Sequence, residues 1–131
     1  MYIVIAAHGH FADSLVASAR MVTGYQGEDI FTLNMTPEKD MAQLCAEAAA
    51  LIERAPDAEY LIFADMFGAS PCNSCLASFR YTNYRLITGA NLPMLIEALL
   101  TKDLMGLEEL WNSLVATGQE TIRPVFIRPE A

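Results

Sequence analysis

The sequence predicts an α/β protein: an open, doubly wound sheet of four parallel strands with helices on both faces, plus an antiparallel C-terminal edge strand. Short apolar, β-branched runs alternate along the chain with segments of helical period. Parallel neighbours need long crossover connections, and each intervening segment is long enough to form one. The chain has 131 residues, of which 53% are hydrophobic, enough for one core without disulfides or metal. We therefore expect a single domain over 1–131.

Two strand–helix units are expected in the first part of the chain. The apolar run 2–7, "YIVIAA", suits a strand that is covered on both faces. Residues 11–23 have apolar side chains at helical spacing, and a second strand is expected at 29–34. The pattern then predicts a helix with Thr36 as its N-cap and Pro37 at its first position.

Two further units follow. The third strand, 59–65, ends on a carboxylate, and Ser70 is expected to cap a helix that runs to about residue 80. The fourth strand covers 84–90, and Asn91 then caps the next helix.

The C-terminal part predicts one more helix and one more strand. The helix is expected at roughly 106–117. The segment 123–129, "RPVFIRP", is apolar with a proline near each end. Since proline cannot donate to a central ladder, this segment fits an edge strand.

Composition and charge argue against several classes of function. A formal net charge of -8 is unsuited to nucleic acid and to anionic membrane surfaces, which attract Lys and Arg. The N-terminus lacks the features of a signal peptide, and no apolar run is long enough to span a bilayer, so we expect no membrane insertion. Three cysteines, an odd number, fit a reducing compartment. We expect a cytoplasmic protein.

Both histidines lie where the first strand gives way to a loop. In open α/β sheets the ligand site lies beyond the carboxyl ends of the strands, which brings His8 and Asp65 to the same rim. If Asp65 accepts the Nδ1 proton of His8, Nε2 keeps a free lone pair and becomes an oriented nucleophile. The alternative is that His8 is a structural residue at a strand end and that Asp65 caps a turn.

An anion site is expected next to this pair. Ser70 begins a helix whose free N–H groups, expected at Cys72 and Asn73, can face a phosphate together with the Ser70 hydroxyl. Gly68 lets the backbone approach closely. No nucleotide-binding glycine motif is present, and no Lys or Arg lies beside His8 in sequence. The alternative is that Ser-Pro is only a good helix start.

Two other chemistries remain open from the residues. Cys72 and Cys75 form C-x-x-C at a helix start, the arrangement of a thiol-disulfide oxidoreductase, with buried packing thiols as the alternative. A metal site from His8, His10 and Asp65 would need a further ligand, which the sequence does not show, so we expect no metal.

Three motifs carry a resemblance to a known family. The stretches "AAHGHFADSL", "FADMFGASPCNS" and "TGANLPMLIEAL" resemble, in order and spacing, the signatures of the IIA domain of the mannose-type (mannose/fructose/sorbose) sugar phosphotransferase system. The resemblance implies that His8 accepts a phosphoryl group from phospho-HPr and passes it to a histidine of the IIB domain. It also implies that Asp65 orients His8, that Ser70 lies at the phosphate site, and that no cofactor takes part.

The resemblance further implies a homodimer in which the two subunits exchange the strand 123–129. It also implies that the IIC/IID membrane complex is only an indirect partner. The candidates for the rim that receives the partners are His10, Met66, Phe67 and Asn91. We expect Phe67 in an exposed apolar patch and Phe11 in the core.

The chain departs from the family pattern at a few positions. Ala7 and Ala69 stand where Thr and Gly are usual, so the loop after the third strand is expected to differ slightly in shape. A domain that only senses phosphorylation within a regulator stays an alternative.

Overall fold

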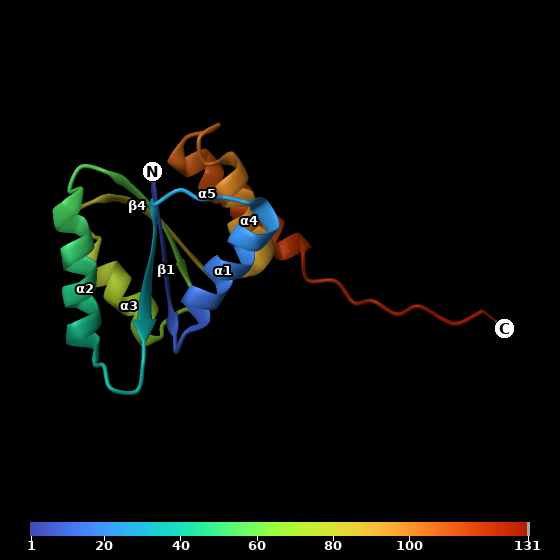
Figure 1. The fold of residues 1–131 in the computed structure, drawn as a ribbon, viewed down its shortest axis with the longest axis horizontal. Coiled ribbons are helices and arrows are strands. Elements are labelled where there is room, and N and C mark those ends of the chain that lie inside the picture. Colours follow the sequence, from blue (N-terminus) through green and yellow to red (C-terminus); the bar gives the residue numbers. More distant parts are fainter. Residues whose placement is uncertain (131) are drawn as a thin grey trace.

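The computed structural model describes residues 1–130 and shows a four-stranded parallel sheet with five helices (Figure 1). The elements follow one another as β1 Tyr2–His8, α1 Phe11–Thr23, β2 Ile30–Met35, α2 Met41–Arg54, β3 Glu59–Ala64, α3 Ser70–Ser78, β4 Asn83–Thr88, α4 Leu92–Thr101 and α5 Leu107–Glu120. Within that range, none of the helices has the length and apolar character that crossing a bilayer requires.

The strand order is β2-β1-β3-β4, and every pairing is parallel. The chain first moves outward from β1 to β2 and then returns past β1 to β3, so the order reverses between β1 and β3. Ala6 pairs with Ala64 of β3 on one side of β1, and His8 pairs with Met35 of β2 on the other. The switch point, where open sheets bind ligands, therefore lies directly beyond His8.

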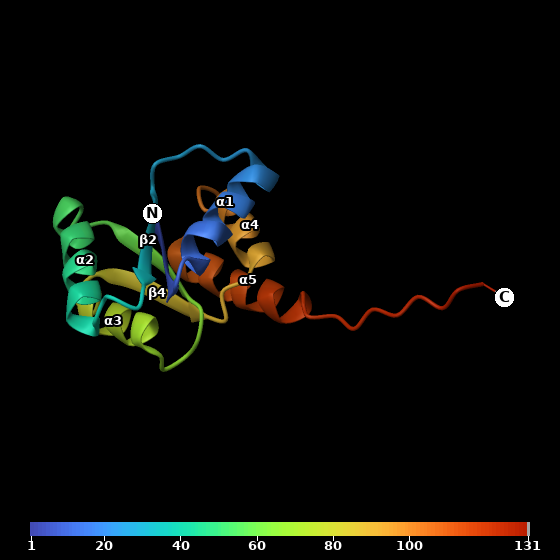
Figure 2. The ribbon, with the colours of Figure 1, turned by 60° about the horizontal axis from the view of Figure 1, so that its bottom comes forward.

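Helices cover both faces of the sheet (Figure 2). Ile3 and Ile5 of β1 pack on the side of α1, α4 and α5, whereas Val4 and Ala6 pack on the side of α2 and α3. Since both faces of β1 are buried, its sequence is an unbroken apolar run. The predicted doubly wound arrangement of four parallel strands is confirmed.

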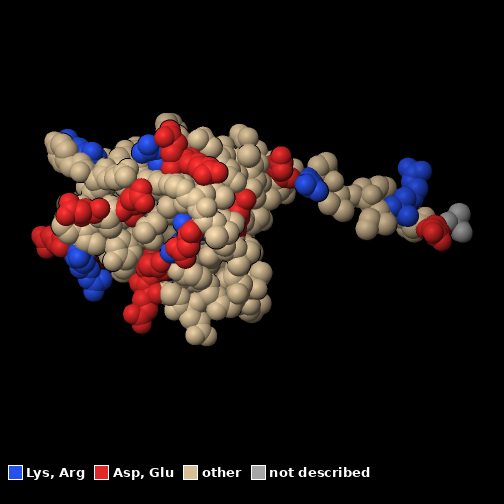
Figure 3. All heavy atoms as spheres, turned by 90° about the horizontal axis from the view of Figure 1, so that it is seen from above, with Lys and Arg blue, Asp and Glu red and all other residues tan. Residues whose placement is uncertain are grey.

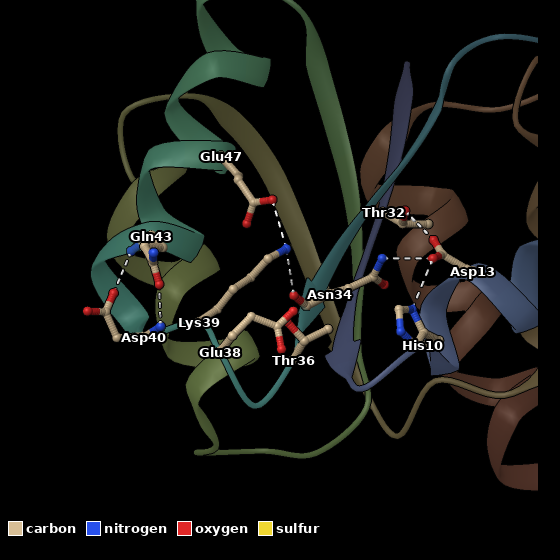
Figure 4. A network of polar contacts seen from close by, with 10 residues as sticks. All are labelled: His10, Asp13, Thr32, Asn34, Thr36, Glu38, Lys39, Asp40, Gln43 and Glu47. Carbon is tan, nitrogen blue, oxygen red and sulfur yellow. Dashed lines mark hydrogen bonds and ion pairs between the residues drawn. The ribbon is translucent and has the colours of Figure 1, made fainter.

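The start of the second helix was predicted wrongly. Residues 36–39 form a turn in which the Lys39 amide donates to the Thr36 carbonyl at 3.0 Å. The helix begins at Met41, after a capping box in which the Asp40 carboxylate accepts from the Gln43 amide and the Gln43 side chain accepts from the Asp40 amide (Figure 4). This box satisfies two backbone donors at once, whereas the Thr36 hydroxyl donates to Glu38 and caps no helix.

Two other helix bounds also differ from prediction. Ala69 is the N-cap of α3, and Ser70 is its first residue. The helix ends at Ser78 rather than near residue 80, because a turn closed by the Thr82 amide on the Phe79 carbonyl follows at once.

The C-terminal segment forms no strand within the described chain. Residues after Thr121 extend away from the body (Figures 1 and 2). The tail has four large apolar side chains that are at least 80% exposed: Ile122, Val125, Phe126 and Ile127. The outer edge of β4 has no strand beside it among residues 1–130, so the predicted edge strand is absent from the single chain.

A buried lysine ties the end of α4 to the loop before β2. The side chain of Lys102 is only 4% exposed, and its ammonium contacts the carboxylate of Asp29, which also accepts from the Tyr25 hydroxyl at 2.6 Å. Burial alone would lower the pKa of Lys102, but Asp29 and Tyr25 outweigh it and the pKa lies above its ordinary value. The pair therefore stays ionised. Acidic and basic side chains also lie interspersed on the face seen in Figure 3.

Replacing Lys102 should destabilise the fold. Lys102→Met leaves the Asp29 carboxylate without its cation, and we expect the free energy of unfolding to fall by about 3 kcal/mol in urea denaturation. Asp103→Asn is the matched control, because Asp103 lies 3.4 Å from the same ammonium but is 83% exposed. It should change stability by at most about 0.5 kcal/mol. Equal losses in the two variants would contradict the assigned role of the buried pair.

Candidate functional site

The reversal of strand order brings His8 and Asp65 together although they are 57 positions apart in the chain. His8 is the last residue of β1, and Asp65 directly follows β3. The His8 amide donates to Asp65 Oδ2 at 2.9 Å, and the His8 ring nitrogen Nδ1 lies 2.7 Å from the same oxygen. The predicted pairing of the two side chains is therefore present, and it fixes both the backbone and the ring of His8.

Asp65 is held as a carboxylate. Its side chain is 15% exposed, and burial alone would raise its pKa. The hydrogen bonds from the His8 amide and ring outweigh burial, so the pKa lies below its ordinary value. Its second oxygen, Oδ1, accepts from the Met66 amide at 2.9 Å. An ionised acceptor on Nδ1 places the ring proton there and leaves Nε2 as the free nitrogen.

The His8 ring is open to solvent on its other side. The side chain is 47% exposed, and no described residue bonds Nε2. A neutral imidazole with a free, accessible Nε2 is a nucleophile that needs no separate base. Gly9 then turns the chain with φ of 59°, a conformation that favours glycine, so that α1 begins two residues after β1 ends.

The start of α3 has some, but not all, of the free amides that were expected there. Since Ser70 is the first helical residue, the amides of Ser70 and Cys72 have no partner within the helix. The Asn73 amide, predicted to be free, instead donates to the Ala69 carbonyl at 2.9 Å as an ordinary helical bond. The Asn73 side chain donates to the Gly68 carbonyl at 3.0 Å and so braces the loop.

The loop before α3 is not strained by its alanine. Gly68 has φ of 78°, the left-handed conformation, whereas Ala69 has φ of -85° and ψ of 169°. Ala69 meets no steric conflict, because an extended backbone suits any residue. The expected small difference of this loop from the family pattern stays a prediction.

Three apolar side chains close in sequence to His8 or Asp65 are exposed. We call Phe11, Met66 and Phe67 the apolar patch, with 45%, 54% and 85% exposure. Phe67 was predicted there, but Phe11 was predicted in the core, and that was wrong because the first turn of α1 lies at the rim of the sheet. Asn91 accepts from the Met94 amide at 3.1 Å, so its side chain serves as the cap of α4.

A second polar network, which the sequence analysis missed, links the start of α1 to β2 (Figure 4). His10 Nδ1 is 3.6 Å from Asp13 Oδ2, and Asp13 accepts from Thr32 at 2.6 Å and from the Asn34 side chain at 2.8 Å. The signals that could have revealed it are the i, i+3 spacing of His10 and Asp13 and the i, i+2 spacing of the two polar residues on β2.

The cysteines do not resemble a redox pair. Cys72 and Cys75 are 1% and 0% exposed. Burial, followed by the neighbouring thiols of Cys72 and Cys45, raises the pKa of Cys75 to about 12. A thiol with this pKa is not a nucleophile at neutral pH, so the structure lends no support to the oxidoreductase alternative. Among residues 1–130, no cluster of side chains suited to hold a metal ion is found.

Comparison with known proteins points to one family. Residues 2–115 match the family model described as "PTS system fructose IIA component". The chain is 30% identical over 133 aligned residues to the mannose-specific EIIAB component of Escherichia coli K12, covering 97% of this chain and 40% of that protein. It is 29% identical to the fructose-specific EIIA component of Bacillus subtilis, covering 92% and 84% of the two chains. The chain thus spans less than half the length of its E. coli relative.

Solved structures have the same fold. The mannose/sorbose-specific IIA subunit from Enterococcus faecalis aligns with a TM-score of 0.90 at 26% identity, covering 99% of this chain and 98% of that one. The component EIIA from Streptococcus agalactiae aligns with a TM-score of 0.83 at 25% identity, covering 94% and 95% of the two chains.

The geometry predicts the tautomer of His8. At about pH 8, where a free imidazole is neutral, ¹⁵N NMR should show the proton of His8 on Nδ1. Asp65→Asn removes the charge that holds the proton there, and the ring should then populate the Nε2–H form. The His10 signals serve as the internal control and should not change. Wild-type protein with the proton on Nε2 would contradict the assigned geometry.

Proposed function

Because this chain belongs to the mannose-type IIA family of the sugar phosphotransferase system, we propose that His8 accepts a phosphoryl group from phospho-HPr and passes it to a IIB histidine during sugar uptake. The observation that carries this proposal is the 2.7 Å contact between His8 Nδ1 and Asp65, opposite an exposed Nε2. The protein would work in the cytoplasm and reach the IIC/IID membrane complex only through IIB.

The reaction moves one phosphoryl group between two imidazoles. Nε2 of His8 attacks phosphorus and forms a new N–P bond, while the N–P bond to the donor imidazole breaks and its electron pair stays on the donor nitrogen. The His8 ring gains positive charge as the bond forms, and the Asp65 carboxylate next to Nδ1 stabilises that charge. Since such transfers pass through a loose transition state, holding Nε2 in line is a large part of catalysis.

The start of α3 would hold the phosphoryl oxygens. The amides of Ser70 and Cys72 are free donors at the positive end of a helix dipole, and the Ser70 hydroxyl adds a third donor. Gly68 in the left-handed conformation shapes the approach, and the Asn73 side chain braces it. These donors are neutral, so the site binds phosphate without the fixed cation of a nucleotide-binding loop.

The apolar patch would receive both protein partners. Met66 and Phe67 directly follow Asp65, and Phe11 lies on the next turn of chain after His8. Exposed aromatic and methionine side chains are typical of the centre of protein interfaces. One patch beside the reacting nitrogen can serve HPr and IIB in turn, because the two complexes form at different steps.

We further propose a homodimer in which the tail, residues 122–130, pairs with the outer edge of β4 in a second copy. That edge is free among the described residues, and hollows of about 500 and 440 Å³ lie along it. Leu86, Thr88 and Trp111 line both hollows. The four exposed apolar side chains of the tail would fill such hollows. The tail backbone would at the same time hydrogen-bond the free N–H and C=O groups at the edge of β4.

Phosphorylation tests the assignment of His8 directly. Purified protein mixed with HPr, Enzyme I and phosphoenolpyruvate should gain one acid-labile phosphate by intact mass. His8→Ala should gain none, because the other imidazole on the rim, His10, lies 3.6 Å from its carboxylate, whereas His8 Nδ1 lies within hydrogen-bond distance of Asp65. His10→Ala should still gain one phosphate. A phosphate that persists in His8→Ala would show that the acceptor is another residue.

The dimer has its own test in solution mass. Light scattering should give twice the chain mass for the wild type, and a variant that ends at Thr121 should be monomeric. Phe126→Asp should weaken the dimer by placing a charge among the apolar contacts. Leu104→Asp is the control, since Leu104 is similarly exposed, at 78%, but lies at the other end of the sheet. A truncated protein that remains dimeric would show that the tail is not the contact.

A further inference from the structure

His10 is a second imidazole on the rim that the proposed phosphoryl transfer does not use. Only Gly9 separates it from His8, and its side chain is 75% exposed. It is the residue just before α1 but forms no side-chain cap of that helix. Its ring is therefore free to respond to the charge of a group bound at His8.

The charges around His10 come from two other elements. Asp13 of α1 lies 3.6 Å from its Nδ1 (Figure 4). The pKa of Asp13 lies below its ordinary value, chiefly because Thr32 donates a hydrogen bond to it. Asn34 and His10 lower this pKa further, and burial opposes the shift without cancelling it. Glu38, after β2, also has a pKa below its ordinary value, chiefly because Thr36 donates to it. Both carboxylates are thus ionised at neutral pH.

The rim offers few other cations. The loops after β1, β3 and β4 contain no Lys or Arg, and the loop after β2 contains only Lys39. Its ammonium is already bound to the Asn34 carbonyl at 3.1 Å and to Glu47 at 2.9 Å (Figure 4). Arg20 and Lys102 lie at the opposite end of the sheet, in contacts with the loop before β2.

We propose that His10 takes up a proton from solvent when His8 is phosphorylated, and that its imidazolium offsets the charge of the phosphoryl group. The inference rests on the function proposed above. A phosphoryl group brings nearly two negative charges to a rim whose anion donors are otherwise neutral amides and a hydroxyl. His10 is a group there that can add positive charge without any change of fold, because an imidazole side chain can be neutral or protonated near neutral pH.

The size of the effect follows from distance and screening. Two residues with one between them have Cα atoms at most about 7 Å apart, so the phosphoryl group lies on the order of 10 Å from the His10 ring. Coulomb attraction at that range, in a solvent-exposed site at low salt, favours protonation by roughly half to one pH unit. By linkage, protonated His10 favours phosphorylated His8 to the same extent, about 3- to 10-fold.

Asp13 has a separate role in this arrangement. Its carboxylate favours the charged ring whether or not His8 carries phosphate, and Thr32 and Asn34 hold the carboxylate in place. It therefore sets where His10 titrates but not the difference that phosphorylation makes. This separation gives the experiment an internal control.

NMR titration of the His10 ring tests the inference. In low-salt buffer, the titration midpoint of His10 should move up by roughly half to one pH unit when the protein is phosphorylated, and 0.5 M salt should remove most of that shift. Asp13→Asn should lower the midpoint in both forms while leaving their difference in place. A midpoint that does not move, or a shift that high salt leaves unchanged, would overturn the inference.

A second measurement uses the exchange of phosphate with HPr. At each pH, the equilibrium constant for phosphorylation by phospho-HPr is compared between wild type and His10→Asn. It should be about 3- to 10-fold larger for wild type near pH 6 and nearly equal near pH 8.5. A ratio independent of pH would count against proton uptake. Intact mass distinguishes failure of the proposed function from failure of this inference. If His8 gains no phosphate, the proposed function is refuted. If His8 gains phosphate but the titration midpoint of His10 does not change, only this inference is refuted.

Discussion

The active arrangement depends on one carboxylate oxygen. Asp65 Oδ2 accepts from both the amide and the ring of His8, so the end of β1, the direction of the imidazole and the position of its proton are all set by the end of β3. This is possible because β1 and β3 are neighbours at the reversal of strand order. A carboxylate elsewhere on the rim could orient the ring, but it could not also fix the backbone.

This anchoring shapes the electrostatics of the whole rim. Asp65 cannot be replaced by a cation without losing the Nδ1–H tautomer, so positive charge for a phosphoryl group has to come from other elements. Under the proposed function, the start of α3 would provide it as helix dipole and free amides, which can hold an anion but carry no full charge. A chain with a net charge of -8 could then bind phosphate locally while remaining acidic overall.

Much of this organisation was predictable from the sequence, since alternating apolar runs fix parallel strands and the strand ends then gather His8 and Asp65. Failures occurred where local signals competed. Thr36-Pro37 is a good helix start, but the Asp40 and Gln43 box a few residues later is better satisfied. Phe11 lies four residues before Leu15 and so has core periodicity on its helix, yet its side chain is 45% exposed at the first helical position. The bonds of Asp13 to β2 depend on strand register, which sequence spacing alone does not reveal.

The tail and the free edge of β4 are best understood together. An exposed strand edge has unpaired backbone groups that can bond another chain. The four exposed apolar side chains of the tail are left largely uncovered by the described residues of their own chain. Each feature alone would be a liability in a soluble domain. In the proposed dimer, the tail of one copy would pair with the β4 edge of the other, so neither would remain exposed. The prolines at 124 and 129 suit a strand that is bonded on one side only. The edge-strand pattern in the sequence is thus consistent with a partner that a single chain does not provide.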